Sequence, residues 1–135
     1  MKETSLEEIE NQIKKTFKEF GGDKPFKPFV MYEKVTDRIC VITADCSVTE
    51  VAITENLVLL ERNHINDNQK THTGFYIENA RYLCRNNNLP ICGKVRIFDI
   101  LKILALHESS FGREAIREII LPILEVYHLC EVDFS

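Results

Sequence analysis

The chain has 135 residues, of which 44% are apolar and 28% charged, with 17 Lys and Arg against 21 Asp and Glu. These values are typical of a globular protein, and the length favours a single domain over residues 1–135. Five cysteines are too few for a disulfide scaffold, and the first residues show no apolar targeting segment. We therefore expect reduced thiols in a cytoplasmic protein. No apolar run reaches the roughly 20 residues that a membrane span needs, so we do not expect the chain to cross a membrane.

The first predicted element is an amphipathic helix near the N-terminus. Its apolar residues recur at steps of three and four, the period of one helix face; they are Leu6, Ile9, Ile13, Phe17 and Phe20. Gly21-Gly22 can adopt the positive φ that ends a helix. The prolines that follow predict an extended connector, because proline can neither continue a helix nor donate within a central strand.

A change to β-branched and aromatic residues after Phe29 predicts four strands. We expect them at 29–34, 38–44, 48–54 and 57–62, joined in chain order into an antiparallel meander by turns at 35–37, 45–47 and 55–56. Residues 63–73 are almost all polar and predict a long loop, a kind of segment that often carries function.

Helical spacing of apolar residues then predicts helices over 75–87, 95–107 and 112–128. The second is apolar around most of its circumference and should be the most buried. Pro122 in the third predicts a kink or restart, because its ring clashes with the carbonyl of Glu118. The predicted fold is α+β: an N-terminal helix, a four-stranded antiparallel meander, then three to four C-terminal helices packed on the sheet.

The hairpin around Glu55-Asn56 predicts two faces of different character. A two-residue turn pairs Ile53 with Val58 and Glu50 with Glu61. Alternation then places Val51, Ile53, Val58 and Leu60 on a core face, and Glu50, Ala52, Thr54, Leu57, Leu59 and Glu61 on the other. The second face is half apolar, and its two facing carboxylates need a nearby cation.

Two interpretations of that second face remain open. In one, helices cover both faces of the sheet and a lysine of the first helix, such as Lys14 or Lys18, neutralises the carboxylates. In the other, the face is a surface for self-association or for a protein partner.

Catalytic chemistry has one set of candidate residues. Cys46 lies on a predicted turn, and His64 and His72 lie in the polar loop. A cysteine nucleophile needs a base within hydrogen-bond reach, so these residues define the hypothesis of a small cysteine-dependent enzyme. The spacing is generic, and a structural thiol is the favoured interpretation.

Metal and cofactor sites are not expected. Cys84 and Cys92 are eight residues apart, as are His64 and His72, and neither spacing matches the close pairs of structural zinc sites. No glycine-rich phosphate loop occurs in the sequence.

A basic stretch containing Arg81, Arg85, Lys94 and Arg96 raises the alternative of nucleic-acid binding. The helix predicted after it is too apolar to lie in a groove. We therefore favour solvated helix faces or salt bridges for these side chains, and consider nucleic acid an unlikely partner.

The preferred function is that of a non-catalytic protein-interaction module, without a cofactor, that binds a basic protein or forms a homodimer. Small immunity proteins and antitoxins neutralise partners in this way, a comparison by analogy alone. Acidic side chains accelerate encounter with a basic partner, and desolvated apolar contacts hold the complex. The expected contact residues are Asp45, Glu50, Glu55, Glu61, Leu57 and Leu59.

Overall fold

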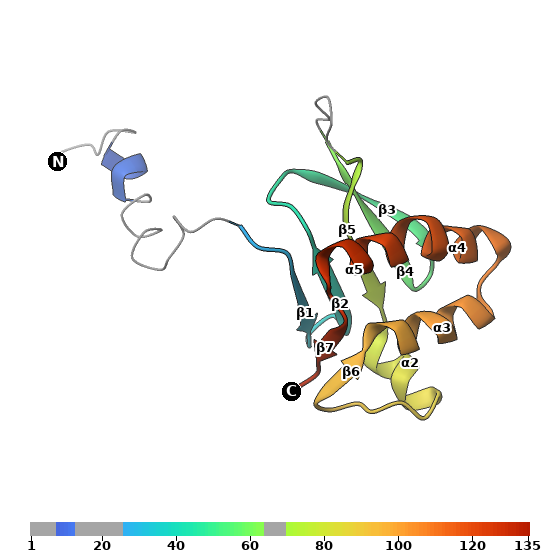
Figure 1. Ribbon diagram of the computed structural model, residues 1–135. Helices are drawn as coiled ribbons and strands as arrows, with labels where there is room; N and C mark the ends of the chain where they lie inside the picture. The colour runs from blue at the N-terminus through green and yellow to red at the C-terminus, as the bar shows by residue number, and fades with distance from the viewer. Residues whose placement is uncertain (1–7, 13–25, 64–69) are drawn as a thin grey trace.

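A five-stranded antiparallel sheet with helices packed on one face forms the body of the protein (Figure 1). The computed structural model describes residues 8–12, 26–63 and 70–135. The strands of this sheet are β1 (Phe29–Glu33), β2 (Arg38–Ile42), β3 (Val48–Thr54), β4 (Leu57–Arg62) and β5 (His72–Glu78). The helices are α2 (Ala80–Asn86), α3 (Ile97–His107), α4 (Ser110–Ala115), the π-helical turn η1 (Ile116–Ile120) and α5 (Leu121–Tyr127). A small second sheet pairs β6 (Lys94–Arg96) with β7 (Glu131–Asp133). The α+β class predicted from the sequence is confirmed.

The order of strands in the large sheet is β1-β2-β5-β4-β3. The predicted four-stranded meander is therefore wrong: β2 and β3 are not neighbours, and a fifth strand lies between β2 and β4. The segment 45–47 is accordingly part of a connection between separated strands and not a hairpin turn.

The fifth strand also corrects the helix predicted over 75–87. Residues 72–78 form β5, and helix α2 begins only at Ala80. Phe75 and Ile77 are fully buried while Tyr76 between them is not, which is the period of a strand. Asn79, at φ 58°, turns the chain from strand to helix.

The β3–β4 hairpin has the predicted two-residue turn but a different register. A β-bulge lies at Ile53, between the pairs Thr54–Leu57 and Ala52–Val58. The extra residue shifts by one position every pair that lies further from the turn. Glu50 therefore lies opposite Leu60, and the predicted Glu50–Glu61 pair does not form.

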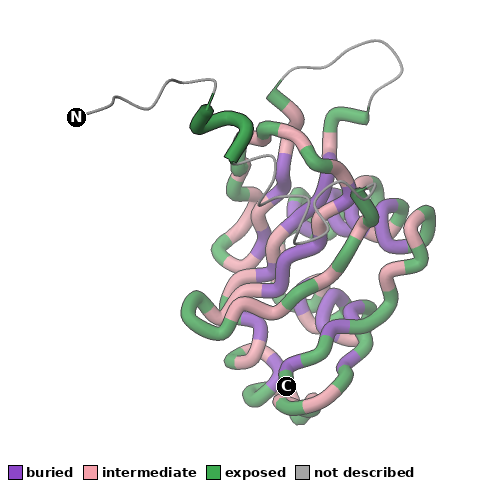
Figure 2. Tube along the Cα trace, turned by 90° about the vertical axis from the view of Figure 1, so that its left-hand side faces the viewer, coloured by how far each residue is buried: buried purple, intermediate pink, exposed green. Residues whose placement is uncertain are grey.

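Helices α2 to α5 pack against one face of the sheet, where the main core lies (Figure 2). The buried sheet residues of this core are Ile39, Val41, Leu57, Leu59, Phe75 and Ile77. Leu57 and Leu59 therefore face the helices, and the predicted assignment of the hairpin faces was wrong. Apolar residues do occur on both faces of β4, because Leu60, on the face opposite Leu59, is also buried.

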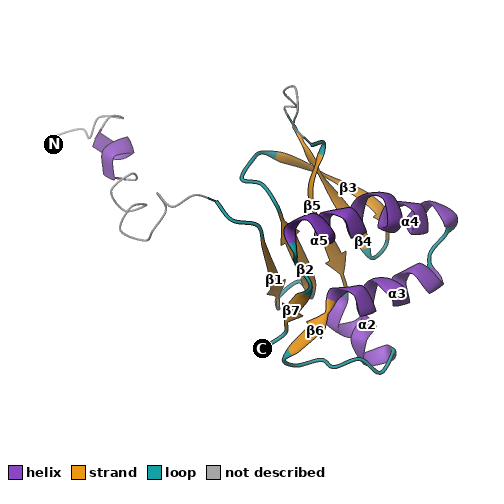
Figure 3. Cartoon of the chain, in the orientation of Figure 1, coloured by secondary structure: helices purple, strands orange, loops and turns teal. Residues whose placement is uncertain are grey.

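Two of the three helices predicted after the sheet, 95–107 and 112–128, lie close to observed helical segments (Figure 3). Helix α3 buries Ile97, Ile100, Leu101 and Leu104, with Lys102 exposed on its outer side. The kink or restart predicted at Pro122 takes the form of a change of helix type without a break: the backbone stays helical at Ile120 and Leu121, η1 is π-helical, and α5 has Pro122 in its first turn. A wider turn at this point accommodates the missing N–H and the ring of proline.

Only part of the predicted N-terminal helix can be compared with the structure. Residues 8–12 are helical and all five are exposed. The rest of that prediction, including Lys14 and Lys18, lies outside the described residues. Among the helices that the structure describes, none is long and apolar enough to cross a membrane.

Candidate functional site: the open face of the sheet

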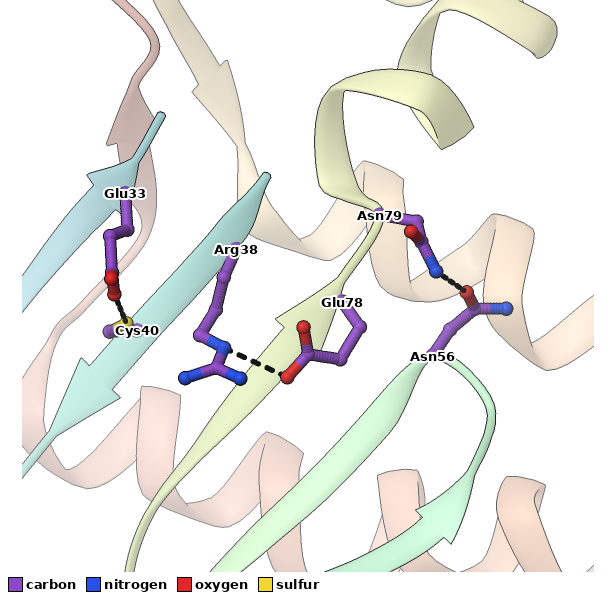
Figure 4. A network of polar contacts seen from close by, with 6 residues as sticks. All are labelled: Glu33, Arg38, Cys40, Asn56, Glu78 and Asn79. Carbon is purple, nitrogen blue, oxygen red and sulfur yellow. Dashed lines mark hydrogen bonds and ion pairs between the residues drawn. The ribbon is translucent and has the colours of Figure 1, made fainter. Parts of the chain in front are cut away.

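The face of the sheet opposite helices α2 to α5 is called the open face below. Strand register places its residues in rows that run across the strands. One row contains Phe29, Ile42, Gly74, Leu60 and Glu50, the next Met31, Cys40, Tyr76, Val58 and Ala52, and the third Glu33, Arg38 and Glu78. Figure 4 looks onto this face, with Arg38, Cys40 and Glu78 standing in front of the strands and the helices behind.

The first two rows are mainly apolar, and they are most accessible along edge strand β1. Phe29 is 40% exposed and Met31 45% exposed. Further into the sheet, Cys40 and Leu60 are buried. The open face thus combines buried apolar side chains at its centre with accessible ones at its edge.

A polar network crosses the third row (Figure 4). Arg38 Nε donates to Glu78 Oε1 at 2.8 Å, and the Arg38 guanidinium lies 4.3 Å from the centre of the Tyr76 ring. Cys40 Sγ lies 3.7 Å from Glu33 Oε2. Arg38 is therefore held in place by both a carboxylate and an aromatic ring.

Burial makes the open-face thiol a poor nucleophile. Desolvation, reinforced by the Glu33 carboxylate, raises the pKa of Cys40 to about 11. Only about one thiol in a thousand is then ionised at pH 8. Desolvation and the neighbouring Glu50 also raise the pKa of Tyr76. Both groups are neutral at physiological pH.

The six contact residues predicted from the sequence do not form one surface. Leu57 and Leu59, 0% and 2% exposed, lie in the core beneath the helices and are inaccessible to a partner. Glu55 is exposed in the β3–β4 turn, and Glu61 lies beside His72. Asp45 and Glu50 are exposed and belong to the open face or its rim.

The sequence analysis missed the residues of β1 and β5 that make up most of the open face. For β1, strand alternation could have indicated that Phe29, Met31 and Glu33 lie on the same face of the sheet. The contribution of Tyr76 and Glu78 was hidden because their segment was assigned to a helix.

The proposed cysteine–histidine pair is not brought together in the described part of the chain. Cys46 lines a cavity at the open face, together with Phe29 and Leu60. His72 Nε2 lies 3.7 Å from Glu61 Oε1 and lines a different cavity, on the helix side, with Ile123. His64 lies outside the described residues. The structure therefore offers no support for catalysis by Cys46 with His72.

The basic stretch is divided in the structure. Arg81 Nη2 donates to the carbonyl of Phe134 at 2.8 Å, and its guanidinium lies over the Tyr32 ring. Arg81 is thus part of the protein's own packing. Arg85, Lys94 and Arg96 are exposed.

Within residues 8–12, 26–63 and 70–135 there is no group of three or more His, Cys, Asp or Glu side chains placed to hold a metal ion. Comparison with known proteins finds no matching family model, no matching curated protein and no matching solved structure. What the fold and site define is an α+β protein whose antiparallel sheet carries its described helices α2 to α5 on one face.

Proposed function

We propose that this protein is a non-catalytic protein-interaction module that binds a basic protein through the open face of its sheet. One observation carries the proposal: helices α2 to α5 lie on the other face, while Phe29 and Met31 remain accessible beside carboxylates. Accessible apolar side chains with a polar rim are the usual composition of a protein interface.

The charge of the open face favours a basic partner. Arg38 pairs with Glu78 and also interacts with Glu50, which accepts a hydrogen bond from Tyr76. The Glu50 and Asp45 carboxylates are exposed near the apolar rows. An acidic rim attracts a basic partner during encounter and repels an acidic one. Burial of Phe29 and Met31 then supplies affinity, because apolar area removed from water contributes roughly 25 cal/mol per Å² before the costs of association.

The same charges count against a homodimer formed through this face. The whole chain carries a formal charge of −4, so two copies repel at long range, and stacked open faces would bring their acidic rims together. A basic partner relieves that repulsion.

The test compares substitutions on opposite sides of the molecule. Met31→Glu places a charge in the apolar row of the open face. Leu106→Glu places the same charge on α3, at a residue that is 80% exposed on the helical side. The full chain and both variants serve as bait, captured proteins are quantified by mass spectrometry, and the leading basic protein is purified for kinetic measurements.

We expect a basic protein that binds the unchanged chain and Leu106→Glu equally, and Met31→Glu at least about tenfold more weakly, a loss of about 1.4 kcal/mol. Its association rate should fall as ionic strength rises. A partner lost with Leu106→Glu but retained with Met31→Glu would place the interface on the helical side. Sedimentation of a stable dimer that Met31→Glu dissociates would replace the proposal with self-association.

A further inference from the structure

A cavity of about 320 Å³ lies at the Phe29 end of the open face. Phe26, Phe29, Ile42, Leu60 and Tyr76 form most of its apolar wall. This volume is at the lower end of the range for small-molecule sites. It corresponds to about ten water-sized units, enough for one aromatic ring with a short substituent.

A buried polar group in the cavity wall has no hydrogen-bond partner within the part of the chain that the structure describes. Thr73 is 2% exposed, and its Oγ1 makes no hydrogen bond to any described residue. The residue sits at the bulge where β4 and β5 change register, between the pairs Leu60–Gly74 and Glu61–His72. Leaving a buried hydroxyl unsatisfied costs about 1–3 kcal/mol, and a ligand group that donates to its oxygen would offset part of that cost.

The charge at the cavity selects the kind of ligand. Asp45 is exposed and contributes to the lining, which among the described residues includes no Lys or Arg. The Asp45 carboxylate favours a cation through Coulomb attraction, and the rings of Phe26 and Phe29 can add to it, whereas the Tyr76 ring already has the Arg38 guanidinium at 4.3 Å. The same arrangement disfavours an anion.

We propose that this cavity binds a small aromatic amine. The ammonium group, with three N–H donors, meets the Asp45 carboxylate and donates to Thr73 Oγ1, while the ring packs against Phe29 and Tyr76. This site shares Phe29 and Asp45 with the docking surface proposed above, but the two proposals can fail independently, because Met31, on which the first test depends, does not line the cavity.

The five cysteines provide a readout within the chain. Cys46 lines the cavity and is partly exposed, whereas Cys92 and Cys130 are exposed elsewhere and serve as controls. The full chain is alkylated with iodoacetamide, and the rate at each cysteine is followed by mass spectrometry. The matched probes are 2-phenylethylamine, 2-phenylethanol and phenylacetate, which share the ring and differ in charge.

We expect 2-phenylethylamine, at about ten times its dissociation constant, to slow alkylation of Cys46 about tenfold by occupying the site. Cys92 and Cys130 should react at unchanged rates. The alcohol should protect Cys46 less, and phenylacetate should not protect it.

Two variants connect protection to the assigned groups. Thr73→Val replaces the unsatisfied hydroxyl with a methyl group, so it should keep or raise the midpoint of thermal unfolding and weaken protection by the amine. Asp45→Asn changes an exposed side chain, so it should weaken protection of Cys46 by the amine without affecting folding. Thr71→Val, an exposed threonine outside the cavity, should leave protection unchanged.

The proposal is overturned if the amine does not slow alkylation of Cys46, or if phenylacetate protects as well as the amine. Protection that survives both Thr73→Val and Asp45→Asn would overturn it as well.

Discussion

Gly74 occupies a position in β5 where the backbone leaves no room for a side chain. Its φ is +151°, and a Cβ atom placed on it would lie 2.1 Å from the carbonyl oxygen of Val41. Val41 belongs to the neighbouring strand β2, so the contact cannot be relieved by rotating a flexible side chain. Close packing of β2 against β5, beside the Thr73 bulge, therefore requires glycine.

Gly74→Ala should lower the free energy of unfolding by at least about 3 kcal/mol, because backbone must shift and an unfavourable φ must be held. Gly93→Ala is the matched control: its φ is +72°, but among the described residues no heavy atom beyond its two chain neighbours lies within 4 Å of the added Cβ, so we expect a loss of about 1 kcal/mol. Urea unfolding of both variants measures the difference. Equal losses would mean that crowding at Val41 has no energetic effect.

At the scale of elements, the turn between β1 and β2 caps helix α2. The Asp37 carbonyl accepts from the N–H of Ala80, and its carboxylate accepts from the N–H groups of Arg81 and Tyr82, at 2.7 and 3.3 Å. Asn79, the residue before the helix, makes no side-chain cap. The Asp37 carboxylate, from a turn distant in sequence, thus accepts hydrogen bonds from the first N–H groups of the helix and interacts favourably with the positive end of the helix dipole.

Tyr32 is coupled to this cap and gives it a dependence on pH. Its hydroxyl donates to Asp37 Oδ1 at 2.6 Å. Burial first, and then the hydrogen bond and charge of Asp37, raise the pKa of Tyr32 to about 12. Because the neutral phenol is favoured in the folded state, its contribution to stability is complete below pH 10 and is lost as pH rises from about 10 to 12.

Tyr32→Phe should therefore weaken the dependence of stability on pH between 10 and 12, where the unchanged chain loses at most about 3 kcal/mol through this group. At neutral pH the variant loses one hydrogen bond, about 1 kcal/mol. Guanidinium unfolding at a series of pH values gives both quantities. An alkaline decline of the same size in the variant would show that the cap does not depend on the neutral phenol.

At the scale of the whole molecule, Arg81 joins parts of the chain that are far apart in sequence. Its guanidinium lies 5.2 Å from the ring centre of Tyr32 in β1 and 5.7 Å from that of Phe134 near the C-terminus. The two rings meet edge to face at 4.7 Å. With the hydrogen bond to the Phe134 carbonyl, Arg81 attaches the C-terminal segment and β7 to the large sheet.

Arg81→Met keeps much of the aliphatic volume and removes these charged contacts. We expect a loss of about 2 kcal/mol, since the gain from the hydrogen bond and ring contacts is partly offset by the cost of burying the charge. Amide hydrogen exchange in β7 should accelerate. Arg85→Met, at an exposed position one turn further along α2, should change stability by less than about 0.5 kcal/mol. Equal losses in the two variants would contradict the role assigned to Arg81.

Local sequence patterns determined the α+β class, the first four strands to within a few residues, the long buried helix α3 and the irregularity of the last helix at Pro122. These features depend on alternation, helical period and the geometry of proline, which act between residues close in the chain. The same patterns misassigned residues 75–78 to a helix, because short apolar runs suit either period.

Only the tertiary structure decided which face of each strand meets the helices and which residues lie on the open face. A single extra residue at Ile53 reverses the side on which the preceding residues of β3, Val48 to Ala52, lie relative to β4. No local sequence preference indicates this bulge. The insertion of β5 between β2 and β4 depends on pairing between distant segments, as does the Arg81 contact with Phe134. The acidic residues were visible in the sequence, but their separation onto different surfaces followed from strand order and register.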